Sequence, residues 1–419
     1  MRKYIILARS IVNIGGEEIY NRNKYLFLRQ KGIDVTIISV TSGKIIINDL
    51  IPFKNNIIEE LCNEPFYYSN KQKEKFLEKI KSKIQDTSNF DEIIIECHTP
   101  KLSVWGELLA KEIGGRSFCL LTDDRFPPLS SSTASFFEYK LLRHELAGIS
   151  KSSLQLLFGN HLSLEDDKKY FLSFNCINSI ESVDNDFGIQ KEKYDFIIGT
   201  IIRLEKVCVP FILDNILDFA RKHKDKKILF IFFGGSSNKK LEKEIIKKMN
   251  VYSNLEFLLT GIIFPVPLVE VEKVDLFINV AGAASATKRM AIPTLSIELE
   301  NGRPLGILGV TTNSSQYRSG NDNCPWDTIS EALENLLIMN KFSLKEIKNK
   351  LIKDPLKVDF TQHDNFIADG LKNEMEYYDF SNYHVSKLWK IMISFLYSLL
   401  GIRGLIKIMK LYRLLFRKK

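Results

Sequence analysis

Residues 274–315 of this chain read VDLFINVAGAASATKRMAIPTLSIELENGRPLGILGVTTNSS. The stretch combines an apolar strand (275–280), a turn of small residues, a short helix and a second strand that starts at Pro293 and Thr294. The small side chains expose backbone at the start of the helix, where unpaired N–H groups and the helix dipole favour a phosphate. The stretch therefore predicts a site shaped for a nucleotide.

Short runs typical of strands alternate with helical patterns along the rest of the chain. They are residues 4–8, 35–39, 92–96 and 118–122, and then 196–202, 228–233, 255–259, 276–280 and 294–297. Between two of these runs, Leu213, Ile216, Leu217 and Ala220 have the spacing of an amphipathic helix. This alternation indicates parallel sheets covered by helices on both faces. The polar run 178–193 is the best candidate for a linker.

The stretch 274–315 resembles the donor-binding core of GT-B glycosyltransferases, especially family 4 and related bacterial capsule and exopolysaccharide enzymes. That family has a Gly-Val-Pro-Thr-like strand start, which residues 291–294 (AIPT) match here. Residues 13–18 (NIGGEE) resemble the family's Gly-Gly-x-Glu helix, and residues 198–206 (IGTIIRLEK) resemble its Gly-x-x-x-Arg-Leu segment. The three matches follow the family's order over about residues 1–320.

The resemblance implies an α/β fold of two Rossmann-like, doubly wound domains facing a cleft (GT-B), followed by a C-terminal amphipathic helical tail. We expect an N-terminal acceptor-side domain over residues 1–180 and a C-terminal donor-nucleotide domain over residues 194–370. Residues 371–419 would form a helical segment with a basic tail. In doubly wound domains, ligands bind beyond the carboxyl ends of the strands.

In the family, the Arg of the Arg-Leu pair and a following Lys bind the donor diphosphate, which implies this role for Arg203 and Lys206. A guanidinium suits it, because it can donate two parallel hydrogen bonds to phosphate oxygens. The other expected donor contacts follow strands or begin a helix, and they are Gly234, Gly235, Gly282, Ser285, Thr287, Lys288 and Glu298. The alternative for each is structural, as a turn glycine or a solvated surface group.

In the first domain, Gly15, Gly16 and Glu17 resemble the family's cleft loop, where glycine permits close approach of the backbone. His98 and Asp123 come after the strands 92–96 and 118–122 and are the candidate catalytic residues, with the neighbouring Asp124 as a companion. A hydrogen-bonded structural histidine and a turn aspartate are the alternatives. No covalent nucleophile is assigned.

The sequence departs from the family at the donor site. Most members carry two glutamates eight positions apart before the Pro-containing strand, and the second of them grips the donor ribose. Aligned on Pro293, these positions hold Ile278 and Ala286. The family's Lys four residues after the Arg-Leu pair falls on Cys208, and the nearest basic residue is Lys206. The donor must therefore be bound by other groups, or not at all.

The net charge of +8 is concentrated at the C-terminus. Residues 381–419 contain nine Lys and Arg and no Asp or Glu, which leaves 50 basic and 51 acidic residues in the rest of the chain. The chain shows no nucleic-acid-binding motif, so no nucleic acid is expected as a partner. The six cysteines are widely spaced and show no metal-ligand pattern, which favours reduced thiols in the cytoplasm and no metal.

The tail is expected to bind an anionic membrane surface through residues 383–419. One helical face would carry Leu405, Ile408, Met409, Tyr412, Leu415 and Phe416, and another Arg403, Lys407, Lys410, Arg413 and Arg417. The apolar run 391–402 has only twelve residues, fewer than the ~20 needed to span a bilayer. The alternative is a helix folded back on the body of the protein.

The leading hypothesis is a glycosyltransferase that transfers a sugar from a nucleoside-diphosphate sugar to a bacterial surface saccharide. We expect this saccharide to be linked to a lipid. No cofactor is expected besides this donor substrate, and the enzyme would be cytoplasmic and peripheral on the inner face of the cell membrane. A nucleotide-sugar epimerase of the same fold is the second hypothesis. A degenerate, non-catalytic partner in a polysaccharide assembly complex is the third, because both glutamates are missing.

Overall fold

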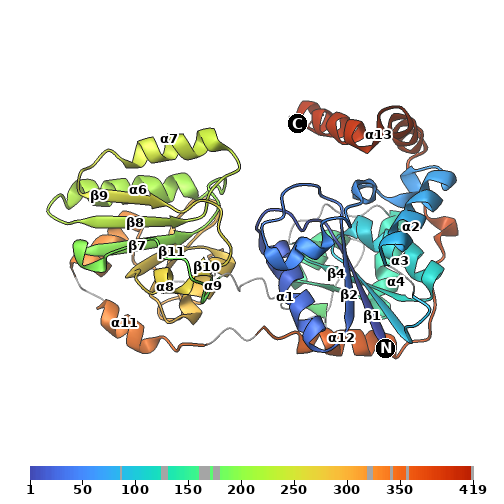
Figure 1. Ribbon diagram of the computed structural model, residues 1–419, viewed down its shortest axis with the longest axis horizontal. Helices are drawn as coiled ribbons and strands as arrows, with labels where there is room; N and C mark the ends of the chain where they lie inside the picture. The colour runs from blue at the N-terminus through green and yellow to red at the C-terminus, as the bar shows by residue number, and fades with distance from the viewer. Residues whose placement is uncertain are drawn as a thin grey trace. The chain divides into compact units, whose positions relative to one another are not determined.

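The computed structural model describes residues 1–84, 87–123, 131–159, 170–172, 180–318, 324–339, 343–354 and 358–416. The chain forms two compact units (Figure 1). The first consists of Met1–Asn175 with Val358–Lys419, and the second of Cys176–Lys357. Each has a mainly parallel sheet and several helices, which confirms the expected α/β class.

The first unit has a five-stranded parallel sheet in the order β2-β1-β3-β4-β5. Its strands are β1 (Arg2–Ala8), β2 (Asp34–Ser39), β3 (Glu92–Cys97), β4 (Arg116–Leu121) and β5 (Leu146–Gly148). Within the sheet, Tyr4 of β1 pairs with Val35 on one side and Ile94 on the other. Both faces of β1 are covered, so its near-continuous apolar sequence is what a buried parallel strand requires.

The helices that follow these strands are α1 (Gly16–Gln30), α2 (Asn70–Ile84), α3 (Pro100–Ile113), α4 (Ser131–Leu142) and α5 (Lys151–Phe158). Local sequence sets the ends of α3. The Thr99 side chain accepts a hydrogen bond from the Leu102 N–H, and Pro100 occupies the first turn. At the other end, Gly114 adopts a φ of 67°, a conformation that favours glycine. This helix therefore begins immediately after β3.

The second unit has a six-stranded sheet in the order β13-β12-β11-β7-β8-β9, parallel except for the β12–β13 pair. Its strands are β7 (Phe196–Ile201), β8 (Ile228–Phe233), β9 (Leu255–Leu259), β11 (Leu276–Asn279), β12 (Thr294–Ile297) and β13 (Pro304–Ile307). A separate two-stranded sheet pairs β6 (Ile180–Glu181) with β10 (Val266–Pro267). The strands expected in this half of the sequence are confirmed to within a residue.

The helices of the second unit are α6 (Val209–Lys222), α7 (Lys239–Met249), α8 (Leu268–Val271), α9 (Ala281–Arg289), α10 (Ile329–Leu333) and α11 (Leu344–Lys350). The predicted stripe of α6 is confirmed, since Leu213, Ile216 and Ala220 are buried in the core of this unit. The proposed linker begins outside the described residues. From Ile180 onward it belongs to the second unit.

The chain returns to the first unit at Val358, earlier than the expected boundary at residue 371. Helix α12 (Thr361–Leu371) lies beside α1, as Figure 1 shows in orange and blue. Phe360 and His363 contact the Tyr20 ring, with centroids 5.6 and 5.9 Å away. A Cβ on Gly370 would come within 2.8 Å of the His144 carbonyl oxygen, so glycine permits this close contact. These aromatic and close-packing contacts attach α12 to the first unit.

Free thiols are found at Cys62, Cys97, Cys119, Cys208 and Cys324, and Cys176 lies outside the described residues.

Candidate functional site

The expected donor residues of the second unit follow four neighbouring parallel strands. Glu298 comes after β12, Gly282 after β11, Arg203 after β7 and Gly234 after β8. Because these strands are parallel and adjacent, their carboxyl ends lie along one edge of the sheet. The structure therefore brings these residues to the edge where doubly wound folds bind ligands. We call this edge the donor edge.

Arg203 is exposed on a backbone that is held from both sides. The preceding Ile202 N–H donates to the Phe233 carbonyl over 3.2 Å, and the following Leu204 N–H donates to Gly235 over 3.3 Å. The side chain of Arg203 itself reaches solvent. Lys206 closes a turn through its N–H to the Arg203 carbonyl and is half-buried. The pair thus presents two positive charges from a fixed loop at the end of β7.

Both glycines after β8 are required by close backbone packing. A Cβ on Gly234 would lie 1.9 Å from the Ile202 carbonyl oxygen. A Cβ on Gly235 would lie 2.8 Å from backbone atoms of Gly261 and Ile262. The glycines therefore let the loops after β7, β8 and β9 touch. This structural role accounts for both residues without a donor.

The start of α9 is shaped by a buried asparagine that the sequence analysis did not single out. Asn279 Oδ1 accepts the Ile201 N–H over 2.8 Å, which joins the ends of β11 and β7. Its Nδ2 donates to Thr287 Oγ1 over 3.2 Å. Ala281 then adopts a φ of 50°, unusual for a residue with a Cβ, and its N–H donates to the Ser315 carbonyl. A longer contact of Nδ2 with the Ala283 carbonyl, at 3.4 Å, reaches the start of the helix, so Asn279 ties α9 to the end of β7.

The expected contacts on α9 divide into buried and accessible residues. Thr287 is fully buried and bonded to Asn279, Thr294 and the Ala283 carbonyl. Thr287 therefore has no exposed atom for a donor, and its position corrects the expectation of donor contact. Gly282, Ser285 and Lys288 remain partly exposed. The stem of Lys288 packs against the turn at Gly309.

Glu298, the acid after β12, is partly buried. Its backbone N–H donates to the Arg303 carbonyl over 2.8 Å, and its carboxylate lies 3.7 Å from Arg318 Nε. It is one of the donor contacts expected from the sequence.

In the first unit, the structure joins Glu17 and Asp123 through Arg9. Glu17 accepts from the backbone N–H of Arg9 over 2.8 Å and from its Nε over 3.0 Å. Nη1 of the same guanidinium donates to Asp123 Oδ2 over 2.8 Å. The side chains of Arg9 and Asp123 are 52% and 29% exposed, whereas that of Glu17 is 4% exposed. Arg9 therefore links a buried carboxylate to an accessible one. Asp124 lies outside the described residues.

His98 is buried between two carboxylates. Its Nδ1 lies 3.3 Å from Glu17 and its Nε2 lies 2.8 Å from Glu96. Burial alone would lower the pKa of His98, but the hydrogen bonds and charges of Glu17 and Glu96 outweigh it and raise the pKa to about 9. His98 is 0% exposed, so the geometry favours a positioning role behind Glu17 over direct contact with a substrate.

The glycine loop of the first unit begins α1 as expected. Gly15 is the N-terminal cap residue, and α1 starts at Gly16, with Glu17 and Glu18 in its first turn. Acidic side chains are favourable there because they interact with the helix dipole. A Cβ on Gly15 would lie 2.7 Å from the Glu18 carboxylate, so glycine leaves room for this side chain.

Sequence reasoning missed Arg9 and Asn279, although each carried a signal. Arg9 directly follows a buried strand, and Asn279 is the lone amide in an apolar run. Across the parts of the chain that the structure describes, no group of three or more His, Cys, Asp and Glu side chains could hold a metal ion.

No family model matches the sequence, and no curated protein is similar to it at a significant level. Solved structures do match. A glycosyltransferase from Rickettsia africae is 12% identical, with a TM-score of 0.53 over 89% of this chain and 99% of that chain. Anabaena Alr3699/HepE with UDP and glucose is 14% identical, with a TM-score of 0.49 over 88% and 99%. A structure named as a Listeria monocytogenes UDP-N-acetylglucosamine 2-epimerase is 13% identical, with a TM-score of 0.47 over 87% and 95%. The first of these similarities shows that the chain has the GT-B fold, as the resemblance implied.

Proposed function

We propose that this protein is a glycosyltransferase that takes a sugar from a nucleoside-diphosphate sugar and transfers it to a saccharide acceptor. One observation carries the proposal: Arg203 and the N-terminus of α9 follow the adjacent strands β7 and β11 on the donor edge. A guanidinium and a helix N-terminus together suit a diphosphate. The GT-B fold adds support, because the Rickettsia structure of this fold is named as a glycosyltransferase.

In this proposal, Arg203 and Lys206 stabilise the negative charge that develops on the leaving diphosphate. The first turn of α9, which includes Gly282, receives a phosphate through its N–H groups, and Ser285 follows directly after this turn. Glu298 is the candidate partner for a donor hydroxyl. The strained φ of Ala281 fits this assignment, because residues in sparsely populated conformations cluster at ligand sites.

The first unit would supply the acceptor side through Arg9 and Asp123. Of the two carboxylates that Arg9 binds, Asp123 is the accessible one, and it is the candidate to accept a proton from an acceptor hydroxyl. Glu17 and His98 would hold Arg9 in place from behind. The acceptor class we propose is a lipid-linked bacterial surface saccharide at the cytoplasmic face of the membrane.

The test has two stages. A thermal-shift panel of UDP, GDP, CDP and ADP identifies the donor base, since a ligand at about 100 times its Kd stabilises the fold by roughly 2.7 kcal/mol. Matching nucleotide sugars are then incubated with and without saccharide acceptors, and released nucleotide and sugar epimers are measured. A transferase releases nucleotide only when its acceptor is present. Epimer formation without acceptor would replace the proposal by an epimerase, and a protein that binds no nucleotide would be a non-catalytic partner.

A further inference from the structure

The C-terminal helix α13 (Lys387–Phe416) consists of two arms. Gly401 has a φ of 64° and a ψ of −177°, which breaks the helix there. The first arm, residues 387–400, is apolar around most of its circumference. The sequence placed the membrane face on residues such as Leu405 and Met409. The structure corrects this, because Leu405 is fully buried and Met409 packs against the core of the first unit. The side chains of Lys410 and residues 412–419 lie outside those described.

The inner face of the first arm is fixed on the first unit. Ile393 is buried, and Trp389, Leu396 and Tyr397 pack against the same core. The Tyr397 ring lies edge-on to Phe76, with centroids 5.4 Å apart. Gln72 of α2 bonds both Ser394 and Ser398, over 3.0 and 3.1 Å. These contacts make the arm part of the folded unit.

None of the residues that the structure describes covers the outer face of the same arm. Leu388, Ile391, Phe395 and Leu399 are spaced three or four residues apart and are 81, 67, 64 and 66% exposed. A helix that is apolar on all sides is normally buried on all sides. Contiguous exposed apolar surface of this kind marks an interaction site.

The charge around this face identifies its partner. No Asp or Glu occurs in residues 381–419, whereas this segment contains Lys387, Lys390, Arg403 and Lys407 and five more basic residues after them. In the described part of α13, Arg403 Nε lies 3.5 Å from the Glu59 carboxylate. Apolar side chains bordered by cations suit the boundary between acyl chains and anionic headgroups.

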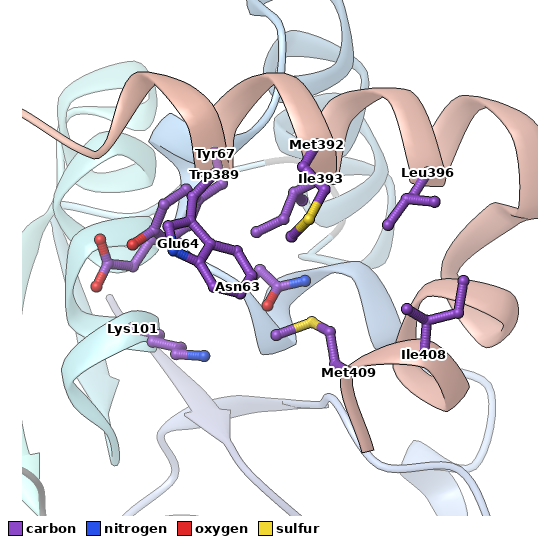
Figure 2. Close-up of a pocket in the computed structure, with 10 residues that line it drawn as sticks. All are labelled: Asn63, Glu64, Tyr67, Lys101, Trp389, Met392, Ile393, Leu396, Ile408 and Met409. Atoms are coloured by element: carbon purple, nitrogen blue, oxygen red, sulfur yellow. The ribbon is translucent and has the colours of Figure 1, made fainter. Parts of the chain in front are cut away.

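A cavity of about 320 Å³ lies against α13, and Figure 2 shows the residues that line it. Met392, Ile393 and Leu396 of the first arm line it with Ile408 and Met409 of the second. Asn63, Glu64, Tyr67 and Lys101 line its other side, beside Trp389. Met392 and Ile408 are each 38% exposed as well, so the apolar surface of α13 continues into this cavity.

We propose that α13 docks on an anionic phospholipid bilayer with the outer face of its first arm in the interface, in the plane of the membrane. Residues 387–409 are apolar and long enough to span a bilayer by composition, with a mean hydropathy of 1.7. The break at Gly401 argues against spanning. The first arm has fourteen residues and is about 21 Å long, which is shorter than the hydrocarbon core of a bilayer at about 30 Å. The inner face is also occupied by the protein's own core.

The test uses the full chain, because deletion of α13 would remove core residues such as Ile393. Wild type and Ile391→Glu/Phe395→Glu are sedimented with vesicles of phosphatidylcholine, alone or with phosphatidylglycerol, at low and high salt. We expect wild type to bind the anionic vesicles at least tenfold more tightly than the neutral ones, and less tightly as salt rises. The double variant should bind the anionic vesicles at least tenfold more weakly than wild type.

The matched control is Val251→Glu/Ile352→Glu, which makes the same change at apolar residues of the second unit that are 64 and 80% exposed. It should bind vesicles like wild type. Thermal midpoints verify folding, and Leu388→Glu, at the most exposed position, replaces the double variant if that one does not fold. Carbonate washing should release bound wild type. The proposal is overturned if wild type does not bind anionic vesicles, or if the α13 variants bind them as well as wild type does. It is also overturned if bound wild type resists carbonate, or if wild type forms a dimer that the double variant abolishes.

Discussion

His98 Nε2 lies 2.8 Å from Glu96 Oε1, and neither side chain reaches solvent. The hydroxyls of Tyr4 and Tyr20 also donate to Glu96. Burial would raise the pKa of Glu96, but the His98 hydrogen bond and the charge of Lys24 outweigh it and hold the pKa well below its usual range. The pair is therefore charged at neutral pH. Because a buried charge without its partner is costly, removal of either residue should destabilise the first unit.

This pair predicts how stability depends on pH. The pKa of His98 is raised from 6.5 to about 9, so its contribution is fully present below about pH 6.5 and is lost as pH rises through about 9. The loss should be roughly 2–4 kcal/mol, since one pKa unit is worth about 1.4 kcal/mol. Urea unfolding between pH 6 and 10 measures it.

His98→Gln should be less stable at pH 6 and should lack most of this slope. His384→Gln, at an exposed histidine, is the control and should keep the slope of wild type. A slope that survives in His98→Gln would show that another group titrates.

Arg203→Ala should weaken binding of the preferred nucleoside diphosphate by about 1.5–3 kcal/mol, the range for hydrogen bonds to charged groups. Stability should change little, because the side chain is exposed. Calorimetric titration of both proteins measures the difference. Arg221→Ala removes a similarly exposed guanidinium from the end of α6 and should bind like wild type. Equal affinities for all three proteins would remove Arg203 from the donor site.

Arg9→Lys should reduce glycosyl transfer about 10–100-fold while donor affinity stays within about twofold. Lysine keeps the charge but cannot bond Glu17 and Asp123 in two fixed directions as the guanidinium does. Initial rates and donor titrations on one preparation separate the two effects. Arg2→Lys, which keeps a surface ion pair with Glu92, is the control. A parallel loss of donor affinity would place Arg9 at the donor instead of the acceptor.

Asn279→Ala should cost about 1–3 kcal/mol of stability, because the Ile201 N–H would lose its buried acceptor. The substitution should also weaken binding of the nucleotide donor, since Asn279 holds α9 against the end of β7. Denaturant unfolding measures the first effect, with the exposed Asn250→Ala as control. Wild-type stability in Asn279→Ala would mean that a water or another group replaces the amide.

The sequence predicted the strands, and the sheet edge that the candidate donor residues share, because both depend on local patterns. Strands such as β8 are unbroken apolar runs, and parallel strands place the residues that follow them at one edge. It could not show that Thr287 points inward, because helical spacing alone does not distinguish the two sides of a nine-residue helix of small residues. Nor could it show that Arg9 joins Glu17 to Asp123, a contact across 114 positions of sequence.

The C-terminal region was harder to predict for a related reason. Phe360 and His363 contact Tyr20 of α1, which lies more than 300 residues earlier in the sequence. No local sequence pattern therefore predicts where the chain returns to the first unit. The glycine at position 401 could equally have been tolerated inside a straight helix. Its left-handed conformation decides which residues of α13 face the core and which face outward.

The return of the chain at Val358 determines the order in which the protein can be completed on the ribosome. Cys176–Lys357 is one uninterrupted segment, whereas the other unit needs both Met1–Asn175 and Val358–Lys419. Domains fold as units during synthesis, usually from the N-terminus onward. Here Cys176–Lys357 can fold first, while Met1–Asn175 still lacks Phe360 and Phe366, whose rings contact Tyr20 and Phe118. We therefore expect the unit whose synthesis begins first to be the last to become resistant to proteases and to aggregation.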